Sequence, residues 1–384
     1  MPVPGSYDTP ILNGAIYHQS TLNDLLVEGL SVTAGLRLDY EKIKMSYNAH
    51  SAMNFDFLFK MGPMQMESKN LDALSSFTGK ESTDYLQLLP KFTIQYAWNK
   101  QNNVYVTATK GYRSGGYNIQ MFSDLIQGSL KNAMLDALAQ DPNFSKFASM
   151  FEKYKDQPAN VSETVLYKPE YSWNYEVGTH LTLFDGKLQA DLAAFYMDTR
   201  DQQISRFSEN GLGRITVNAG KSRSIGAEAS LRAQLTDAWS LNGNYGYTYA
   251  TFTDYETNEK AGKEIVKISY NGHYVPFVPK HTFSVGTQYI WTLRKNSILD
   301  NITFNANYKA AGRIYWTEKN DASQSLYGTL NGRISLNKGN GQIGFWVNNA
   351  LNTDYQAFYF ETMSRGFAQM GRPVQVGVDI RCRF

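Results

Sequence analysis

The chain ends in Gly371-Arg372-Pro373-Val374-Gln375-Val376-Gly377-Val378-Asp379-Ile380-Arg381-Cys382-Arg383-Phe384, and from Val374 onward every second residue is apolar. The apolar positions are Val374, Val376, Val378, Ile380, Cys382 and Phe384. Glycine, polar and charged residues stand between them. Because neighbouring residues of a β-strand point to opposite faces, this stretch predicts a strand with one apolar and one polar face. Such a strand suits a wall between lipid and water, as in transmembrane barrels.

The same alternation recurs along the chain. Between residues 30 and 41 it continues for about twice the length of a usual soluble strand, which is typical of a tilted strand that crosses a bilayer. We predict about thirteen strands, at residues 12–22, 30–41, 84–98, 104–113, 171–184, 188–196, 225–235, 239–249, 280–291, 302–316, 325–336, 342–349 and 371–384. Since a closed antiparallel barrel in one chain normally has an even number of strands, we expect an uncounted strand or a wall that continues outside this chain.

The connections between these strands alternate in length, as expected when short turns face the periplasm and long loops face the outside. We expect short turns at 99–103, 185–187, 236–238 and 338–341, with a slightly longer one at 293–300. We expect long loops at 48–83, 114–168, 256–279 and 353–370, and medium connections at 208–213 and 318–323. Residues 121–139 have helical spacing, so the loop 114–168 should contain a helix.

Composition excludes several other classes of protein. No stretch approaches the ~18 consecutive apolar residues of a membrane-spanning helix. The net charge of +2 gives no reason to expect nucleic-acid binding. The single cysteine, Cys382, excludes an internal disulfide, and the five histidines have no metal-ligand spacing. No nucleophile, base and orienting group occur together, so we predict no catalytic site and no cofactor.

Several segments resemble one family in their order and spacing. They are Leu36-Arg37-Leu38-Asp39-Tyr40, Leu89-Pro90-Lys91, residues 108–118, Tyr167-Lys168-Pro169-Glu170, Trp173-Asn174-Tyr175-Glu176-Val177-Gly178, Asn218-Ala219-Gly220, Gly226-Ala227-Glu228, residues 347–355, Gly371-Arg372-Pro373 and the terminal Phe384. The chain resembles the C-terminal part of TonB-dependent outer-membrane receptors, and the resemblance covers most of its length.

This resemblance implies a fold, a location and partners. The fold would be an all-β transmembrane antiparallel barrel, of which residues 1–384 supply about 13–14 strands out of about 22. The location would be the outer membrane of a Gram-negative bacterium. The function would be TonB-energised uptake of a ferric siderophore or similar iron complex, and the partners would be outer-membrane lipid, the TonB complex and the barrel-assembly machinery. Residues 1–6 have no basic and apolar leader pattern, so we expect neither a signal peptide nor a plug domain within this chain.

Ligand contacts would come from aromatic and arginine side chains near the outer ends of strands, because these residue types dominate binding hot spots. The candidates are Tyr112, Arg113, Tyr117, Arg313, Tyr315, Trp316, Tyr359 and Phe360. Tyr315 and Trp316 also fit an outer aromatic girdle, which we favour for these two. Gly115 and Gly116 fit a bend where a strand leaves the wall better than a ligand loop. Glu176 and Glu228 lie on inward faces, where they would pair with cations of the wall or of a plug. Phe384 would be the assembly signal.

Two alternatives to an energised receptor follow from the same pattern. One is a complete, smaller passive channel of about fourteen strands. The other is a soluble or surface β protein that binds glycans, since tyrosine is abundant. A glycan-binding protein would cover the apolar row of Val376, Leu231 and Tyr247 with protein, whereas a barrel would expose that row to lipid.

Overall fold

The computed structural model describes residues 4–207, 213–261, 264–295, 297–362 and 365–383, and its main feature is one antiparallel sheet of 14 strands. The strands of the sheet are β1 (Gly5–Asp8), β2 (Ile11–Leu22), β3 (Leu30–Met61), β4 (Met64–Asn99), β5 (Asn102–Arg113), β8 (Glu170–Leu183), β9 (Leu188–Phe207), β10 (Arg214–Thr236), β11 (Trp239–Asp254), β14 (His281–Thr292), β15 (Asn301–Ala311), β18 (Tyr327–Lys338), β19 (Gly341–Asn348) and β22 (Gln375–Cys382). From β3 onward each pairs with the next of these in chain order. The predicted all-β antiparallel fold is confirmed.

β1 and β2 share one position in the sheet, because both pair with β3. β2 pairs with residues 32–43 of that strand, and β1 pairs with residues 46–49 above it. The 14 strands therefore occupy 13 positions across the wall, and this number matches the thirteen strands predicted from the alternation.

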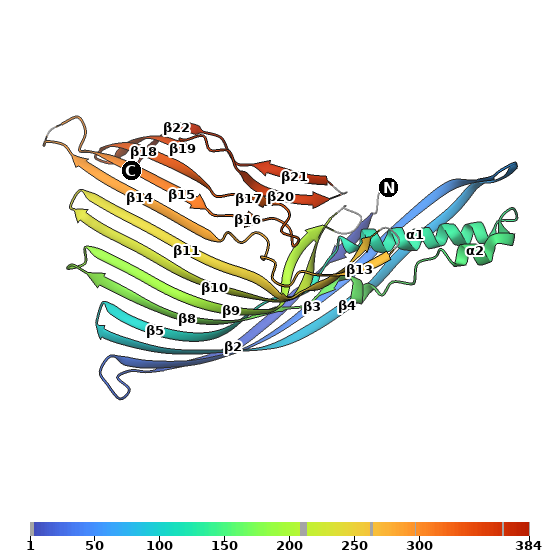
Figure 1. Ribbon diagram of the computed structural model, residues 1–384, viewed down its shortest axis with the longest axis horizontal. Coiled ribbons are helices and arrows are strands. Elements are labelled where there is room, and N and C mark those ends of the chain that lie inside the picture. Colours follow the sequence, from blue (N-terminus) through green and yellow to red (C-terminus); the bar gives the residue numbers. More distant parts are fainter. Residues whose placement is uncertain (1–3, 208–212, 262–263, 296, 363–364, 384) are drawn as a thin grey trace.

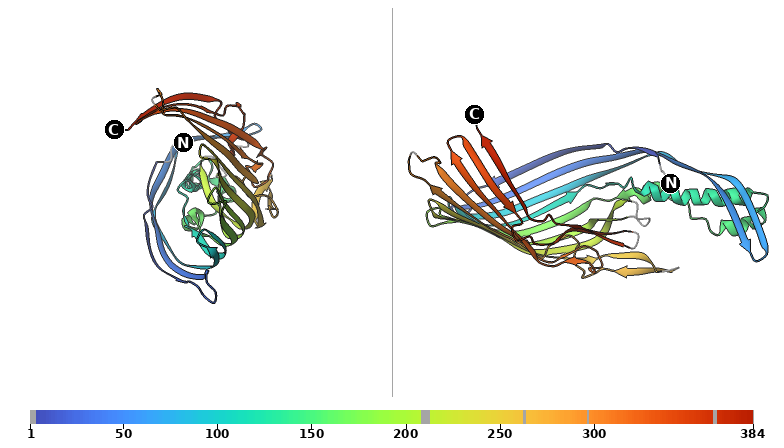
Figure 2. Two further views of the ribbon diagram at one scale, coloured as in Figure 1. Left: turned by 90° about the vertical axis from the view of Figure 1, so that its left-hand side faces the viewer. Right: turned by 90° about the horizontal axis from the view of Figure 1, so that it is seen from above.

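The sheet curves into a wall with a convex, apolar outer face (Figures 1 and 2). The outer residues Val376 and Leu231 are 76% and 45% exposed, so protein does not cover this face as a soluble glycan-binding fold would require. Among the described residues no pairing joins β2 to β22, so the described part of the wall is open between these two strands. A closed channel of about fourteen strands, the passive alternative, is thus not what the described strands form.

The connections sort by side as predicted. Tight turns join the strands at one end of the wall, and short hairpins and helices gather at the other (Figure 1). The hairpins are β12 (Glu256–Ala261) with β13 (Glu264–Ser269), β16 (Ile314–Tyr315) with β17 (Ser323–Gln324), and β20 (Gln356–Thr362) with β21 (Arg365–Met370), and a further short strand pair, β6 (Gly116–Tyr117) with β7 (Leu166–Tyr167), closes the segment that carries the helices. The helices are α1 (Met121–Gln140), η1 (Ser145–Phe147), α2 (Ala148–Glu152) and α3 (Val161–Val165), and α1 confirms the predicted helix at 121–139.

The prediction of a loop at 48–83 is wrong. β3 and β4 continue as a paired hairpin to Met61 and Met64, with one register irregularity between Phe55 and Phe57. This hairpin projects well beyond the rest of the wall, and α1 and α2 run beside it (Figures 1 and 2). We call the hairpin together with α1, η1 and α2 the arm.

Residues 48–83 were predicted as a loop because they are polar and rich in methionine. The physical reason for the error is that the apolar residues of β3 change faces. Up to Tyr40 they lie on the outer face, whereas Ile43, Met45 and Ala49 lie on the inner face and are almost fully buried. In this outer part of β3 the inner face packs on α1, whereas the residues of the outer face are polar and exposed or half-buried. β11 repeats this face reversal, since its inner residues turn from polar to apolar at Ala250 and Phe252, both buried.

Two apolar clusters hold the arm together. Near its base Phe122 of α1 is fully buried against Tyr7 and Tyr47, with ring centroids 5.1 and 4.8 Å away. Further out, Phe144 packs edge-on against Phe57 of β3 at 5.2 Å. None of the helices in the described part of the chain is long and apolar enough to cross a lipid bilayer.

Candidate ligand site at the outer loops

The pocket that gathers the predicted aromatic residues lies among the outer loops and has a volume of about 480 Å³. We call it the loop pocket. Four segments far apart in the sequence line it, namely the adjoining ends of β9 and β10, residues 275–278, residues 316–319 and residues 359–362 of the β20 hairpin. Its lining combines aromatic rings with arginine, lysine and glutamate side chains.

A chain of aromatic rings ties these loops together. Phe277 lies 5.5 Å from Trp316 and stacks on Phe358 at 5.6 Å between ring centroids. Phe358 continues to Phe360 at 5.9 Å, and Phe360 stacks on Phe367 across the hairpin at 5.2 Å. Offset and tilted ring pairs of this kind stabilise each other beyond their buried area. The pocket therefore has a rigid aromatic wall built from three separate connections.

Phe277 is held in an unusual backbone conformation. Its φ angle of 65° lies in the left-handed region, which bulky residues rarely adopt. Its backbone N–H donates to the carbonyl oxygen of Tyr315 at 2.8 Å, which fixes the strained residue against the neighbouring loop. Strained residues of this kind concentrate at functional sites, because the surrounding structure must maintain them.

The loop pocket also presents unneutralised positive charge. Arg206 and Arg214 are exposed at the adjoining strand ends, and neither has a carboxylate partner among the described residues. The guanidinium carbon of Arg214 lies 5.4 Å from the centre of the Phe358 ring, a cation–π distance. Of the pocket's carboxylates, Glu361 accepts a hydrogen bond from the Tyr359 hydroxyl at 2.9 Å. This hydrogen bond raises the pKa of Tyr359, so the phenol stays neutral at physiological pH.

Trp316 contributes a free hydrogen-bond donor. The residue is only 6% exposed, and its indole N–H has no hydrogen-bond partner among the residues that the structure describes. A buried donor without an acceptor is unusual in folded proteins, and a ligand oxygen would satisfy it. Trp316 does not lie in an outer aromatic girdle, as we favoured from the sequence. Its side chain packs on Phe277 in the loop pocket and does not face lipid.

The structure brings three of the eight predicted ligand residues into the loop pocket, namely Trp316, Tyr359 and Phe360. Tyr315 lies next to it and stacks on Tyr274, with ring centroids 5.1 Å apart. Arg313 is exposed two residues earlier in the chain. Lys280 donates to the Tyr274 hydroxyl at 3.5 Å, so a basic group borders this tyrosine stack.

The other predicted residues lie at the outer end of β5. Tyr117 packs against the cluster around Phe122, and burial raises its pKa to about 12, so it has a structural role. Tyr112 is half-buried and Arg113 exposed, and neither lines the loop pocket. A Cβ on Gly115 would lie 2.6 Å from the carbonyl oxygen of Tyr167, so this glycine serves close backbone approach, as its position at a bend suggested.

The sequence analysis missed some residues of the pocket, and one predicted residue is not described by the structure. The missed residues are Arg206, Arg214 and Phe277, together with Phe358, which stacks on Phe277 beside the pocket. Phe277 stands between Pro276 and Val278-Pro279, an aromatic residue in a stiff loop, which is the one local signal that the sequence carried. Phe384, the predicted assembly signal, lies outside the described residues.

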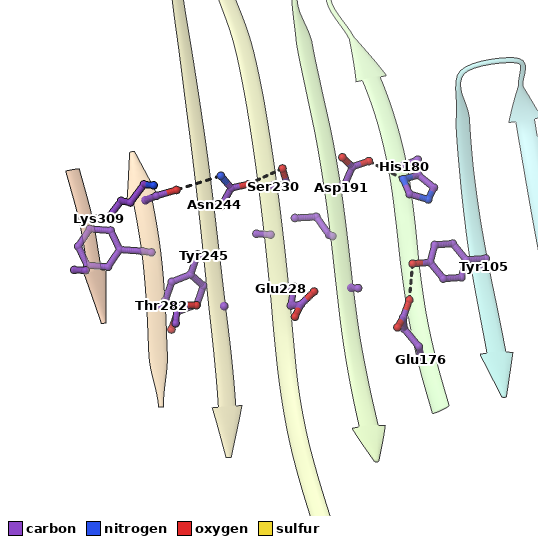
Figure 3. A pocket seen from close by; sticks show the side chains of 17 residues that line it. Tyr105, Glu176, His180, Asp191, Glu228, Ser230, Asn244, Tyr245, Thr282 and Lys309 are labelled. Carbon is purple, nitrogen blue, oxygen red and sulfur yellow. Dashed lines mark hydrogen bonds and ion pairs between the residues drawn. The ribbon is translucent and has the colours of Figure 1, made fainter. Parts of the chain in front are cut away.

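A second polar pocket, of about 600 Å³, lies on the inner face of the wall. Figure 3 shows Tyr105 turned toward Glu176 and His180 toward Asp191 on neighbouring strands, with Glu228 beside them. The Tyr105 hydroxyl donates to Glu176 at 2.7 Å, and His180 Nδ1 lies 2.6 Å from Asp191. Glu228 has no ion-pair partner among the described residues. The predicted inward position of Glu176 and Glu228 is therefore confirmed.

These inner-wall carboxylates are suited to bind cations rather than to catalyse a reaction. No activated nucleophile accompanies them in the pocket. Within the described residues no group of three or more histidine, cysteine, aspartate or glutamate side chains could hold a metal ion. Glu228 and Glu176 could instead hold arginine or lysine side chains of whatever segment fills the lumen.

The chain matches a family model and several curated proteins. The model of the TonB dependent receptor-like β-barrel matches residues 15–350. The chain is 26% identical over 160 residues to a probable TonB-dependent siderophore receptor, PiuA of Acinetobacter baumannii, across 40% of this chain and 20% of that receptor. It is 25% identical over 179 residues to the catecholate siderophore receptor Fiu of Escherichia coli K12, across 47% of this chain and 20% of that receptor.

Solved structures show the same fold over nearly the whole chain. The ferric yersiniabactin uptake receptor FyuA from Yersinia pestis superposes with a TM-score of 0.69 at 19% identity, covering 100% of this chain and 47% of that receptor. The siderophore receptor PiuA from Acinetobacter baumannii superposes with a TM-score of 0.64 at 15% identity, covering 97% of this chain and 43% of that receptor. The chain thus spans less than half the length of these two receptors.

Proposed function

The chain belongs to the TonB-dependent receptor-like β-barrel family, and from this premise we propose that it is the C-terminal wall of a receptor for TonB-energised uptake of a ferric siderophore or similar iron complex. Members of the family are outer-membrane receptors and transporters of Gram-negative bacteria, so the chain is an outer-membrane protein and not an enzyme. The curated relatives, which are siderophore receptors, support the choice of ligand class.

The observation that carries the proposal is the loop pocket. It lies among the loops at the end of the wall opposite the tight turns, where an incoming ligand first meets the receptor (Figure 1). Its volume of about 480 Å³ falls within the range of pockets for drug-sized ligands. Aromatic rings converge there with two arginines that have no carboxylate partner among the described residues and with one indole N–H that the described residues leave unsatisfied.

These groups suit a ligand that presents several anionic oxygens around a compact centre. Arginine binds such oxygens through paired N–H donors, and Trp316 supplies one more donor in a place that water does not reach freely. The exposed ring of Phe277 would pack against the organic frame of the ligand. An iron complex chelated by oxygen donors has both features.

The remaining partners follow from the same premise. We propose that the outer face contacts membrane lipid, that Glu176 and Glu228 hold basic side chains of a lumen-filling plug, and that the plug connects the receptor to the TonB complex. We propose that the barrel-assembly machinery recognises the C-terminal sequence, whose last residue is Phe384.

The test measures iron uptake and ligand binding by the receptor that contains this chain. A bacterium that relies on this receptor should grow under iron limitation on at least one ferric siderophore, and growth should stop when TonB is absent. In the purified receptor, the Arg206→Ala/Arg214→Ala double variant should bind that siderophore about 10–100-fold more weakly, because two charge-assisted contacts are lost.

Two controls make the result specific. Arg294→Ala changes an exposed arginine in the turn at the opposite end of the wall and should bind like wild type. Trp316→Phe keeps the ring but removes the N–H, and should weaken binding about tenfold. If the Arg206→Ala/Arg214→Ala variant binds the siderophore as tightly as the Arg294→Ala variant, the loop pocket is not the ligand site. If solutes pass through the protein in vesicles without TonB, the proposal of energised uptake is wrong.

A further inference from the structure

The arm carries a second, smaller cavity that the proposed uptake function does not use. It has a volume of about 220 Å³ and lies between the β3–β4 hairpin and the helices. Its lining consists of Phe57, Phe59, Leu135, Phe144, Phe147, Met150, Phe151 and Tyr154. Six of these eight side chains are aromatic, and none is charged. We call this cavity the arm cavity.

The arm cavity opens to solvent on one side. Met150 and Tyr154 line it and yet are 39% and 61% exposed, whereas Phe144 and Phe151 are buried at its base. Met150 belongs to α2, and Tyr154 follows four residues later, one helical turn away. The mouth of the cavity is therefore the surface formed by these two side chains, and the cavity is not a sealed packing defect.

Unneutralised lysines stand next to this mouth. Lys146 and Lys153 flank Met150 at a spacing of four and three residues, which places them near the same face of the η1–α2 segment. Lys60 follows Phe59 on β3 and therefore points to the opposite face of the strand, away from the cavity. In the described part of the chain neither Lys146 nor Lys153 has a carboxylate partner. These two lysines thus stand beside an apolar opening.

The nearby carboxylates are occupied by other groups. Lys155 binds both Asp136 and Glu152, at 2.6 and 2.5 Å, and these contacts raise its pKa. The Asp56 carboxylate accepts the backbone N–H of Asn70 at 2.9 Å. Lys155 balances one of the two negative charges that it contacts, and in the described part of the arm no ion pair joins Lys146 or Lys153 to a carboxylate.

From this arrangement we propose that the arm cavity binds a small aromatic carboxylate, with its ring among the phenylalanines and its acid group toward Lys146 and Lys153. A volume of 220 Å³ holds one substituted ring and is below the ~300 Å³ at which pockets for drug-sized ligands begin. The six surrounding rings offer edge and face contacts to a planar guest, which an aliphatic chain would use less well. The site is separate from the loop pocket, so this proposal does not depend on the uptake function.

The test uses 4-(trifluoromethyl)benzoate as the probe and the full chain in lipid nanodiscs, so that no detergent enters the cavity. Fluorine NMR line broadening should show saturable binding of the benzoate. The neutral analogue 4-(trifluoromethyl)benzamide should bind about tenfold more weakly, since it lacks the charge that the lysines attract. Met150→Trp, which fills the mouth with a ring, should abolish the broadening for both probes.

Three further variants assign the binding to this cavity. Lys146→Glu/Lys153→Glu should reduce benzoate affinity at least tenfold and leave the benzamide unchanged. Lys100→Glu, an exposed lysine in a turn at the far end of the wall, should change neither. Arg206→Ala/Arg214→Ala should also bind the benzoate normally, because it alters only the loop pocket. Equal binding of acid and amide, or normal binding by Met150→Trp, would overturn the proposal. So would absence of binding to wild-type protein whose α1 amides are protected from hydrogen exchange.

Discussion

Replacing Val106 with arginine tests whether the outer face of the wall meets lipid. Val106 lies on β5 and is paired with Ile94 on one side and Val177 on the other. All three side chains point outward and are well exposed. If hydrocarbon surrounds them, Val106→Arg places a charge in the apolar layer. Such substitutions on the lipid face of barrels cost about 2–4 kcal/mol near the bilayer midplane.

The neighbouring residue provides a matched control. Thr107 points to the inner face and is paired with Glu176, so an arginine at position 107 would find a carboxylate and water. Thr107→Arg loses the hydroxyl contacts to Thr93 and to the carbonyl oxygen of Phe92, at 2.8 and 3.1 Å. Two hydrogen bonds are lost and one contact with Glu176 is gained, so the net loss is one hydrogen bond. Because one hydrogen bond contributes about 1 kcal/mol, the inner variant should lose no more than about 1 kcal/mol of stability.

The measurement is the free energy of unfolding of protein folded into phospholipid vesicles, from guanidinium titrations followed by tryptophan fluorescence. Val106→Arg should lower the midpoint with an unchanged slope, which indicates a loss of stability and not a change in the exposed surface. Thr107→Arg should shift the midpoint much less. If the two variants lose the same stability, or the inner one loses more, the assignment of outer and inner faces is wrong.

Further predictions concern the arm, the outer turns and the opposite end of the wall. Phe122→Ala should destabilise the packing of α1 on β3 by about 3–5 kcal/mol, seen as faster hydrogen exchange in α1 with unchanged exchange in β14 and β15. Asn349→Ala should cost about 2–3 kcal/mol in unfolding free energy, because its side chain donates to the carbonyl oxygens of Thr353 and Arg372 and accepts from the backbone N–H of Thr353. The pKa of Asp300 is lowered by the backbone N–H of Gly339 and by Lys338, so its stabilising contribution is complete above about pH 4 and lost as the pH falls below it. Asp300→Asn should therefore flatten the fall in unfolding midpoint between pH 5 and about pH 2, and an equally steep fall in both proteins would contradict this reasoning.

The wall could be predicted from the sequence because lipid imposes one simple rule along each strand. Every second side chain from Val374 to Ile380 must be apolar if hydrocarbon covers that face, and the rule repeats at each of the thirteen positions. The same rule explains the one large error. Beyond Tyr40 no lipid covers the outer face, so the alternation continues with the faces exchanged, and a search for one apolar face ends there.

The candidate site was only partly predictable, because it is assembled from loops. Trp316, Tyr359 and Phe360 could be named because they are large aromatic residues near strand ends. These residues lie close to Phe277 and Arg214 only because three connections fold over the wall. No periodic pattern in the sequence predicts how those connections fold. Tyr117 was named for the same reason as Trp316, yet it packs against the Phe122 cluster and supports the arm.

The face reversal also gives the thickness of the membrane that this protein inhabits. On β4 the outer residues are apolar from Trp98 to Leu86, and the next outer residue, Asp84, is charged. Those twelve steps span about 40 Å along the strand at ~3.3 Å per residue, or about 28 Å along the membrane normal for a strand tilted by ~45°. Lengthening or shortening this interval by two residues should therefore alter which bilayers, graded by acyl-chain length, accept the protein most readily.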